Sequence, residues 1–390
     1  MEFLEKPEDY KDWIKLAEHA ATLEELTAVE KTSANRAFRF LALEFGTDFL
    51  KQWKGAPHPL WMQILNLAPW TRKWIILFAR DIRELKSCRG YDGLISRLKG
   101  RESFDEGQSV LRAASRLARA GFTVEIDPSV QSGDVVKKPD LLIRDAQSGD
   151  QLYCEVAILG ASKPSQDAYE TLRSVTDILW RSVPFILYCG RVQRTLSAAH
   201  LHEVVGKVME TLESVQRDGH FRSCVVAGVV EIGIAPKEDE TMLFAWAEER
   251  GLRIGEFIGP GYDVDEVART KNKIIKEQEQ IPRTSAGLLI LENSNLFLRM
   301  VNPEAVASEL EEAVYAWPHL LMTVVTGGWT GKIDEEVRMI GDHVLIRQQV
   351  VELIAENALI LLNRFCEVKI SPGCITRIYN AWREKDRVEW

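Results

Sequence analysis

The chain has 390 residues, a formal net charge of -9 and a hydrophobic share of 46%, so it is long enough to bury a large core. Proteins that coat nucleic acid without regard to sequence are usually basic, because they neutralise phosphates, and the negative charge argues against such a packaging role. A nuclease remains compatible with this charge, since metal-binding carboxylates are themselves acidic.

The cysteines and histidines give no pattern of disulfides or structural zinc. None of the six cysteines forms a CxxC pair, and the closest two histidines, His200 and His202, would fall on different sides of a helix. The N-terminal segment is acidic and lacks the apolar stretch of a signal peptide, and no apolar run is long enough to cross a bilayer. We therefore expect a cytoplasmic protein.

Residues 1–100 are predicted to form a helical, tryptophan-rich N-terminal domain. Thr22 and Glu25 match a capping box, and Pro69 should interrupt the last long helical stretch. We interpret the five tryptophans of this segment as core residues of a helical domain. The alternative is a surface for a protein partner or nucleic acid, formed by Trp70 and Trp74 with Arg72, Lys73, Arg80 and Arg83.

From about residue 101 strands alternate with helices, which predicts an α/β domain over 101–390 with a mixed central sheet flanked by helices. A helix over 109–120 precedes a strand over 122–127. Two further runs, 141–144 and 151–159, are predicted to pair as an antiparallel hairpin. We also predict a loop over 130–140, one strand over 224–236 and a helix over 350–365.

The predicted hairpin brings two carboxylates together. Asp140 lies at the start of its first strand and Glu155 in the middle of its second, so a tight turn should place the two side by side. Such a pair could hold a hard divalent cation, Mg²⁺ or Mn²⁺. Glu155 shares a strand face with Ala157, opposite the apolar face that should pack on the core, so its charge is either solvated or functional.

This order of helix, strand, Pro139-Asp140, hairpin and Glu155 strand resembles the core of the PD-(D/E)xK nuclease superfamily, with its restriction-endonuclease-like fold. The resemblance covers residues 101 to about 190 and includes the QDAY sequence at 166–169. It implies a nuclease that acts on DNA or RNA phosphodiesters with Mg²⁺ or Mn²⁺. The resemblance implies that Asp140, Glu155 and Glu106 on the first helix are the metal ligands, with Glu102 as an alternative to Glu106, and a role in bacterial defence would follow by analogy.

The chain departs from the family at Ala157, which stands where the family has a lysine that assists catalysis. We predict that Lys163 takes its place, with Lys137 and Lys138 as alternatives. The helical segment with Arg269, Lys271, Lys273 and Lys276 is interpreted as a solvated face. The alternative function is a catalytically inactive pseudo-nuclease that serves as a protein-interaction or scaffold module.

Overall fold

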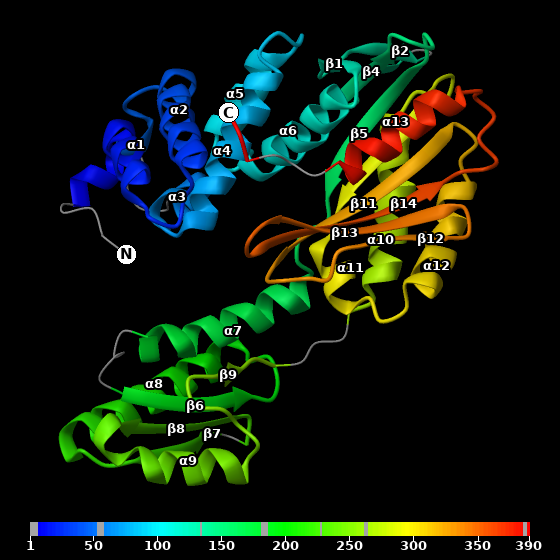
Figure 1. Cartoon of the computed structure of the whole chain (residues 1–390). Helices are drawn as coiled ribbons and strands as arrows, with labels where there is room; N and C mark the ends of the chain where they lie inside the picture. The colour runs from blue at the N-terminus through cyan, green and yellow to red at the C-terminus, as the bar shows by residue number, and fades with distance from the viewer. Residues whose placement is uncertain are drawn as a thin grey trace. The chain divides into compact units, whose positions relative to one another are not determined.

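The computed structural model describes residues 7–52, 58–132, 135–180, 186–226, 228–260, 264–384 and 388–390 (Figure 1). Contacts between residues divide the chain into two compact units. The larger unit consists of Met1–Leu159 and Glu266–Trp390, and the smaller unit is Gly160–Asp265. These units do not follow the boundary expected near residue 100, because the N-terminal helices and one face of the main sheet share a single hydrophobic core.

The N-terminal region is helical, as predicted. Its helices are η1 (Pro7–Lys11), α1 (Trp13–Thr22), α2 (Ala28–Phe45), η2 (Phe49–Lys51), α3 (Pro59–Leu65), α4 (Pro69–Glu84) and α5 (Tyr91–Lys99). The predicted break at Pro69 is confirmed, since Pro69 begins α4. The predicted capping box is wrong: Thr22 ends α1, and the box that forms joins Thr27 and Glu30 before and within α2.

The charged and aromatic residues of this region are used within the chain. Arg72 is buried and donates to main-chain carbonyls of α3, and Lys73 pairs with Glu30 and Glu352. Arg80 pairs with Asp81, and the Arg83 guanidinium lies over the Trp390 ring. These contacts favour the interpretation of the segment as a helical core over that of a nucleic-acid surface.

The larger unit is built on a mixed sheet of eight strands, in the order β1-β4-β5-β10-β11-β14-β13-β12. The strands are β1 (Phe122–Ile126), β4 (Leu141–Asp145), β5 (Gln151–Ile158), β10 (Ala286–Glu292), β11 (Leu320–Thr330), β12 (Glu336–Ile340), β13 (His343–Val351) and β14 (Ile354–Leu362). β4 and β5 form the predicted antiparallel hairpin, whereas β5, β10 and β11 run parallel. The fold is therefore mixed α/β with a helical N-terminal region, as the sequence predicts.

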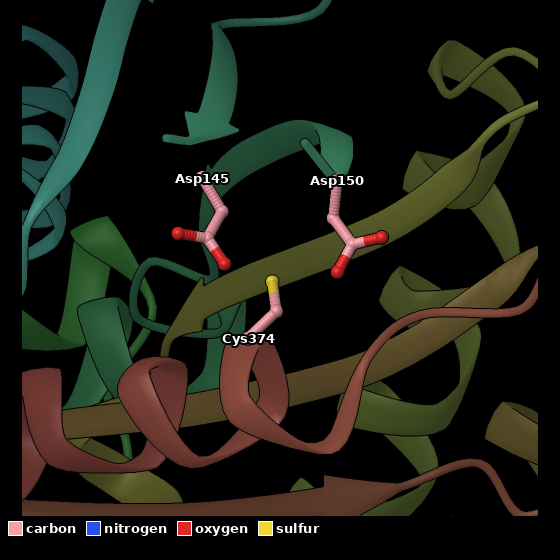
Figure 2. A group of neighbouring side chains, drawn as sticks. All are labelled: Asp145, Asp150 and Cys374. Carbon is pink, nitrogen blue, oxygen red and sulfur yellow. The ribbon is translucent and has the colours of Figure 1, made fainter. Parts of the chain in front are cut away.

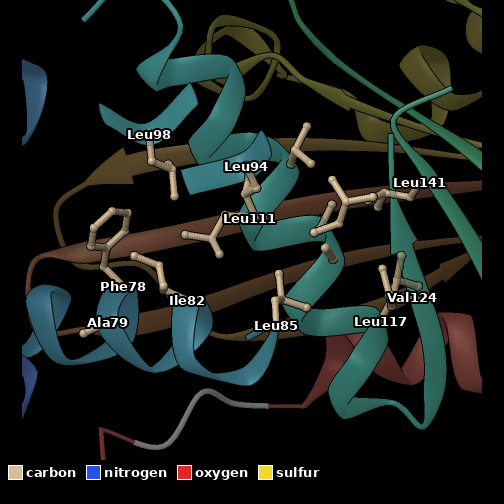
Figure 3. Packing of buried hydrophobic residues seen from close by; sticks show 14 of the residues in the cluster. Phe78, Ala79, Ile82, Leu85, Leu94, Leu98, Leu111, Leu117, Val124 and Leu141 are labelled. Carbon is tan, nitrogen blue, oxygen red and sulfur yellow. The ribbon is translucent and has the colours of Figure 1, made fainter. Parts of the chain in front are cut away.

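Helices cover both faces of this sheet (Figure 1). The remaining helical elements of the unit are α6 (Phe104–Arg119), α10 (Glu266–Glu277), η4 (Gln278–Gln280), α11 (Ser294–Arg299), α12 (Pro303–Tyr315) and α13 (Pro372–Arg383). One face packs on α6 and α13 in a core that continues into α4 and α5 (Figure 3). The other face packs on α10, α11 and α12 in a second core. Both faces of the central strands are thus buried.

Three predictions of local structure are wrong. The segment 350–365 forms β14 and the end of β13, because β14 pairs with β11 on one side and β13 on the other and buries both faces. A strand buried on both faces shows no strict alternation of polar and apolar residues, so its sequence can look like that of a helix. Residues 224–236 form two strands joined by a turn in which Gly228 has a φ of 64°, and the expected loop contains the pair β2 (Val130–Ser132) and β3 (Val135–Lys137).

The smaller unit is a separate α/β domain inserted between β5 and α10. Its four-stranded sheet has the order β7-β8-β6-β9. Its elements are α7 (Lys163–Trp180), β6 (Ile186–Val192), α8 (Ala198–Asp218), β7 (Arg222–Val226), β8 (Val230–Pro236), η3 (Lys237–Asp239), α9 (Glu240–Glu249) and β9 (Phe257–Ile258). Across the described part of the chain, no helix is long and apolar enough to cross a membrane.

Candidate metal centre

The hairpin places Asp140 and Glu155 side by side, as predicted. Leu141 pairs with Cys154 in the β4–β5 register, so Asp140 comes next to Glu155. The Val156 main-chain N–H donates to Asp140 Oδ2 at 2.9 Å, and the Asp140 main-chain N–H donates to the Glu155 carboxylate. Each carboxyl group therefore accepts a hydrogen bond from the main chain of the neighbouring segment, which helps to fix their relative position.

Glu155 lies under the helical layer on the second face of the sheet. Its neighbour on the same strand face, Ala157, belongs to the core shared with α10 and α12. The Glu155 Oε2 atom is buried and has no hydrogen-bond partner among the described residues. Glu155 as a whole is half-buried, because helices cover much of the strand face that was expected to meet solvent. A buried carboxylate oxygen without a partner is costly when the group is ionised, so this place favours a protonated Glu155 or a bound cation.

Burial and neighbouring charge make Glu155 a proton-carrying group. Burial, followed by the charges of Asp140 and Glu277, raises the Glu155 pKa to about 9, against a smaller opposing effect of Lys273. Burial also raises the pKa of Asp140, although the Val156 N–H and the Arg97 charge oppose this rise. Two carboxyls at one place cannot both ionise cheaply, so at neutral pH Glu155 keeps its proton.

Helix α10 adds a lysine and a third carboxylate to this place. Lys273 Nζ lies 2.8 Å from Glu277 Oε1, and only 22% and 12% of these side chains are exposed. Both are near enough for their charges to change the Glu155 pKa. The residues Glu266, Thr270, Ile274 and Glu277 form the buried stripe of α10, and Lys273 lies beside it. The prediction that Lys273 belongs to a solvated face is therefore wrong.

Helix α5 contributes an arginine that contacts Asp140. Arg97 Nη1 lies 3.4 Å from Asp140 Oδ1, and Arg97 Nη2 lies 3.1 Å and 3.2 Å from the two carboxylate oxygens of Asp127. Asp127 follows β1 with a left-handed backbone, at a φ of 51°, and its N–H donates to the Asp140 carbonyl at 2.8 Å. Asp140 is thus flanked by the buried Glu155 and by a guanidinium.

The donors at Asp140 and Glu155 fit a hard divalent cation. Carboxylate oxygens are the ligands that Mg²⁺ and Mn²⁺ prefer, and Mg²⁺ commonly uses one or two carboxylates with water completing its shell. The unpartnered Glu155 Oε2 beside Asp140 is the observation that supports this fit, because a bound cation would compensate the buried charge. Glu277 does not join the pair in a preassembled trio of ligand atoms, so water would supply the remaining positions.

A tighter group of possible ligand atoms has a structural explanation. Asp145, Asp150 and Cys374 bring their ligand atoms within 4.8 Å of one another (Figure 2). Asp145 already binds Gln147, Ser148 and Arg377, and Asp150 accepts from the N-cap residue of α13, Ser371. Burial raises the pKa of the Cys374 thiol to about 12. This group fastens the hairpin turn to the start of α13.

Within the described part of the larger unit, neither Glu106 nor Lys137 makes an ion pair or a hydrogen bond with Asp140 or Glu155. Glu106 is exposed in the first turn of α6 and makes neither an ion pair nor a hydrogen bond with the described residues. Lys163 begins α7 in the smaller unit, where it pairs with Asp167, and its catalytic role remains a prediction. Lys137 donates to the main-chain carbonyls of Glu279 and Ile281 at 2.7 Å and 2.9 Å, so it clamps the segment after α10.

Sequence reasoning missed Lys273, Glu277 and Arg97 as neighbours of the carboxylate pair. For α10 a signal was present: Glu266, Thr270 and Glu277 recur at helical spacing on the side of Ile274, which marks a polar stripe on a buried face. Arg97 carried no comparable signal, because its position depends on how α5 crosses α6.

No family model, curated protein or solved structure matches this chain. Function must therefore be argued from the chemistry of the site itself.

Proposed function

We propose that this protein is a metal-dependent nuclease-like phosphodiesterase, with Mg²⁺ or Mn²⁺ held by Asp140 and Glu155. The observation that carries the proposal is the buried Glu155 Oε2, which has no partner among the described residues and lies beside a second carboxylate. The Asp140 N–H leaves this oxygen without a partner, so a cation beside it would compensate the charge of the ionised group. The order of elements that resembles the PD-(D/E)xK core supports the same reaction class.

In this proposal Lys273 supplies the positive charge that a lysine supplies in the nuclease family at the position of Ala157. Ala157 is packed in the core, whereas Lys273 reaches the surroundings of Glu155 from α10. A bound divalent cation would polarise a phosphoryl oxygen and lower the pKa of a water molecule. Glu155 must release its proton before it can serve as an anionic ligand, so activity should rise as the pH approaches 9. Lys273 would then stabilise negative charge that develops on the phosphate.

The test is cleavage of labelled single-stranded DNA, double-stranded DNA and RNA at alkaline pH, with Mg²⁺ or Mn²⁺. We expect Asp140→Asn and Glu155→Gln to abolish cleavage, and Lys273→Met to slow it by about 10²–10³. Lys271→Met is the matched control, because Lys271 lies on the same helix but pairs with Glu312. This control should cleave like the wild type.

Two results would count against the proposal. Cleavage that survives both carboxylate substitutions would come from another site or another protein. No cleavage with either metal on any substrate would favour the inactive pseudo-nuclease, in which the pair is a remnant and the fold serves as an interaction or scaffold module.

A further inference from the structure

The Arg97 guanidinium contacts two carboxylates, those of Asp140 and Asp127. Its Nη1 contact with Asp140 is long, at 3.4 Å, and its Nε atom is buried without a partner among the described residues. Its better contact is with Asp127, at 3.1 Å and 3.2 Å. The guanidinium is thus shared unequally between two carboxylates, and one of its donors is unused.

The Arg97 Cβ is held in place by packing against α6, whereas the Arg97 guanidinium has two carboxylate acceptors. A Cβ placed on Gly107 of α6 would lie 3.1 Å from the Arg97 Cβ, so α5 and α6 cross closely at this point. The Arg97 carbonyl accepts from the Ser103 hydroxyl at 2.9 Å, which fixes the C-terminal end of α5. Only 24% of the Arg97 side chain is exposed. The guanidinium therefore has a short path between Asp140 and Asp127 and little freedom elsewhere.

We propose that Arg97 is a built-in competitor for the metal: it neutralises Asp140 when no divalent cation is bound, and it moves fully onto Asp127 when one binds. This inference rests on the proposed metal site at Asp140 and Glu155. Asp127 lowers the free-energy cost of this exchange, because it pairs with the Arg97 guanidinium when the metal displaces that group from Asp140. The exchange would set the metal affinity of the site lower than the two carboxylates alone would give.

The test is Mn²⁺ titration of the full-length chain by isothermal titration calorimetry, with the wild type and all variants at the same alkaline pH. Arg97→Gln should bind Mn²⁺ about tenfold more tightly than the wild type, because the competing charge is gone. Asp127→Asn should bind about tenfold more weakly, because Arg97 then has only Asp140. Arg101→Gln is the control for a general change in charge, since Arg101 is exposed and pairs with Glu102. It should change the affinity by less than about twofold.

The double variant separates exchange from a simple electrostatic field. If Asp127 acts by receiving Arg97, then Asp127→Asn should have little effect in the Arg97→Gln background. The inference would be overturned if the effects of the two substitutions on the Mn²⁺ binding free energy were additive in the double variant. An unchanged Mn²⁺ affinity in Arg97→Gln would also overturn it. Arg97→Met, which keeps the aliphatic stem against Gly107, replaces the Gln variant if circular dichroism shows that the latter is unfolded.

The outcome also distinguishes this inference from the proposed function. If wild type and Arg97→Gln bind Mn²⁺ equally and Asp140→Asn abolishes binding in both, the metal site stands and the exchange is wrong. If neither protein binds Mn²⁺, the metal site itself is wrong.

Discussion

The substitution Glu155→Gln tests whether the buried carboxyl is protonated in the folded protein. The Glu155 pKa rises from an ordinary 4.5 to about 9 on folding, so the folded state holds a proton that the unfolded state releases between these values. In this window the unfolded state binds fewer protons, and each pH unit lowers the free energy of unfolding by about 1.4 kcal/mol. The stability contributed by the proton is complete below 4.5 and is lost as the pH rises through about 9.

Glutamine keeps the shape of the protonated carboxyl but cannot ionise. From about pH 6 to about pH 8, Glu155→Gln should therefore become more stable relative to the wild type by about 3 kcal/mol. The assay is urea unfolding in metal-free buffer, followed by tryptophan fluorescence. All tryptophans except Trp180 and Trp246 lie in the larger unit, so the signal reports mainly on the unit that holds Glu155.

The exposed Glu106 provides the matched control. Glu106→Gln removes an exposed carboxyl from the same unit, so it controls for the general effect of losing one carboxyl group. A difference between Glu155→Gln and the wild type that does not change with pH would refute the reasoning, since it would mean that Glu155 ionises in the folded protein as it does in the unfolded chain.

Three further substitutions test the packing around the site. Gly90→Ala should lower the free energy of unfolding by at least about 2 kcal/mol, because Gly90 has a φ of 88° and a Cβ there would lie 2.2 Å from the Ile126 carbonyl oxygen; urea unfolding measures this loss. Asn363→Ala should cost about 2–3 kcal/mol in the same assay, since the buried Asn363 amide contacts three main-chain carbonyls between α12 and β11. Burial lowers the His58 pKa to about 4, so stability should fall as the pH drops below 6.5, and His58→Gln should reduce the difference in unfolding free energy between acidic and neutral pH.

Local patterns were enough to predict the hairpin and the meeting of its two carboxylates. The alternation of apolar and other residues in 151–159 assigns Cys154 and Glu155 to opposite faces, and a short turn fixes the register. The α/β class followed from alternating strands and helices. These features depend on residues close together in the sequence, so one chain was sufficient to predict them.

The surroundings of Glu155 could not be predicted in the same way. Its burial depends on α10, which follows β5 only after an entire inserted unit. The role of Lys273 was hidden because a run of charges looks the same on a solvated face and beside a buried carboxyl. The segment 350–365 was mispredicted for a related reason, since a strand buried on both faces has no alternation to show.

The most direct measurement is an anomalous difference map from crystals of the protein grown with Mn²⁺ at alkaline pH. The proposed site predicts a peak between the Asp140 and Glu155 carboxylates, with Arg97 on Asp127. A peak at Asp145, Asp150 and Cys374, or no peak near Glu155, would contradict the assignment of the metal centre.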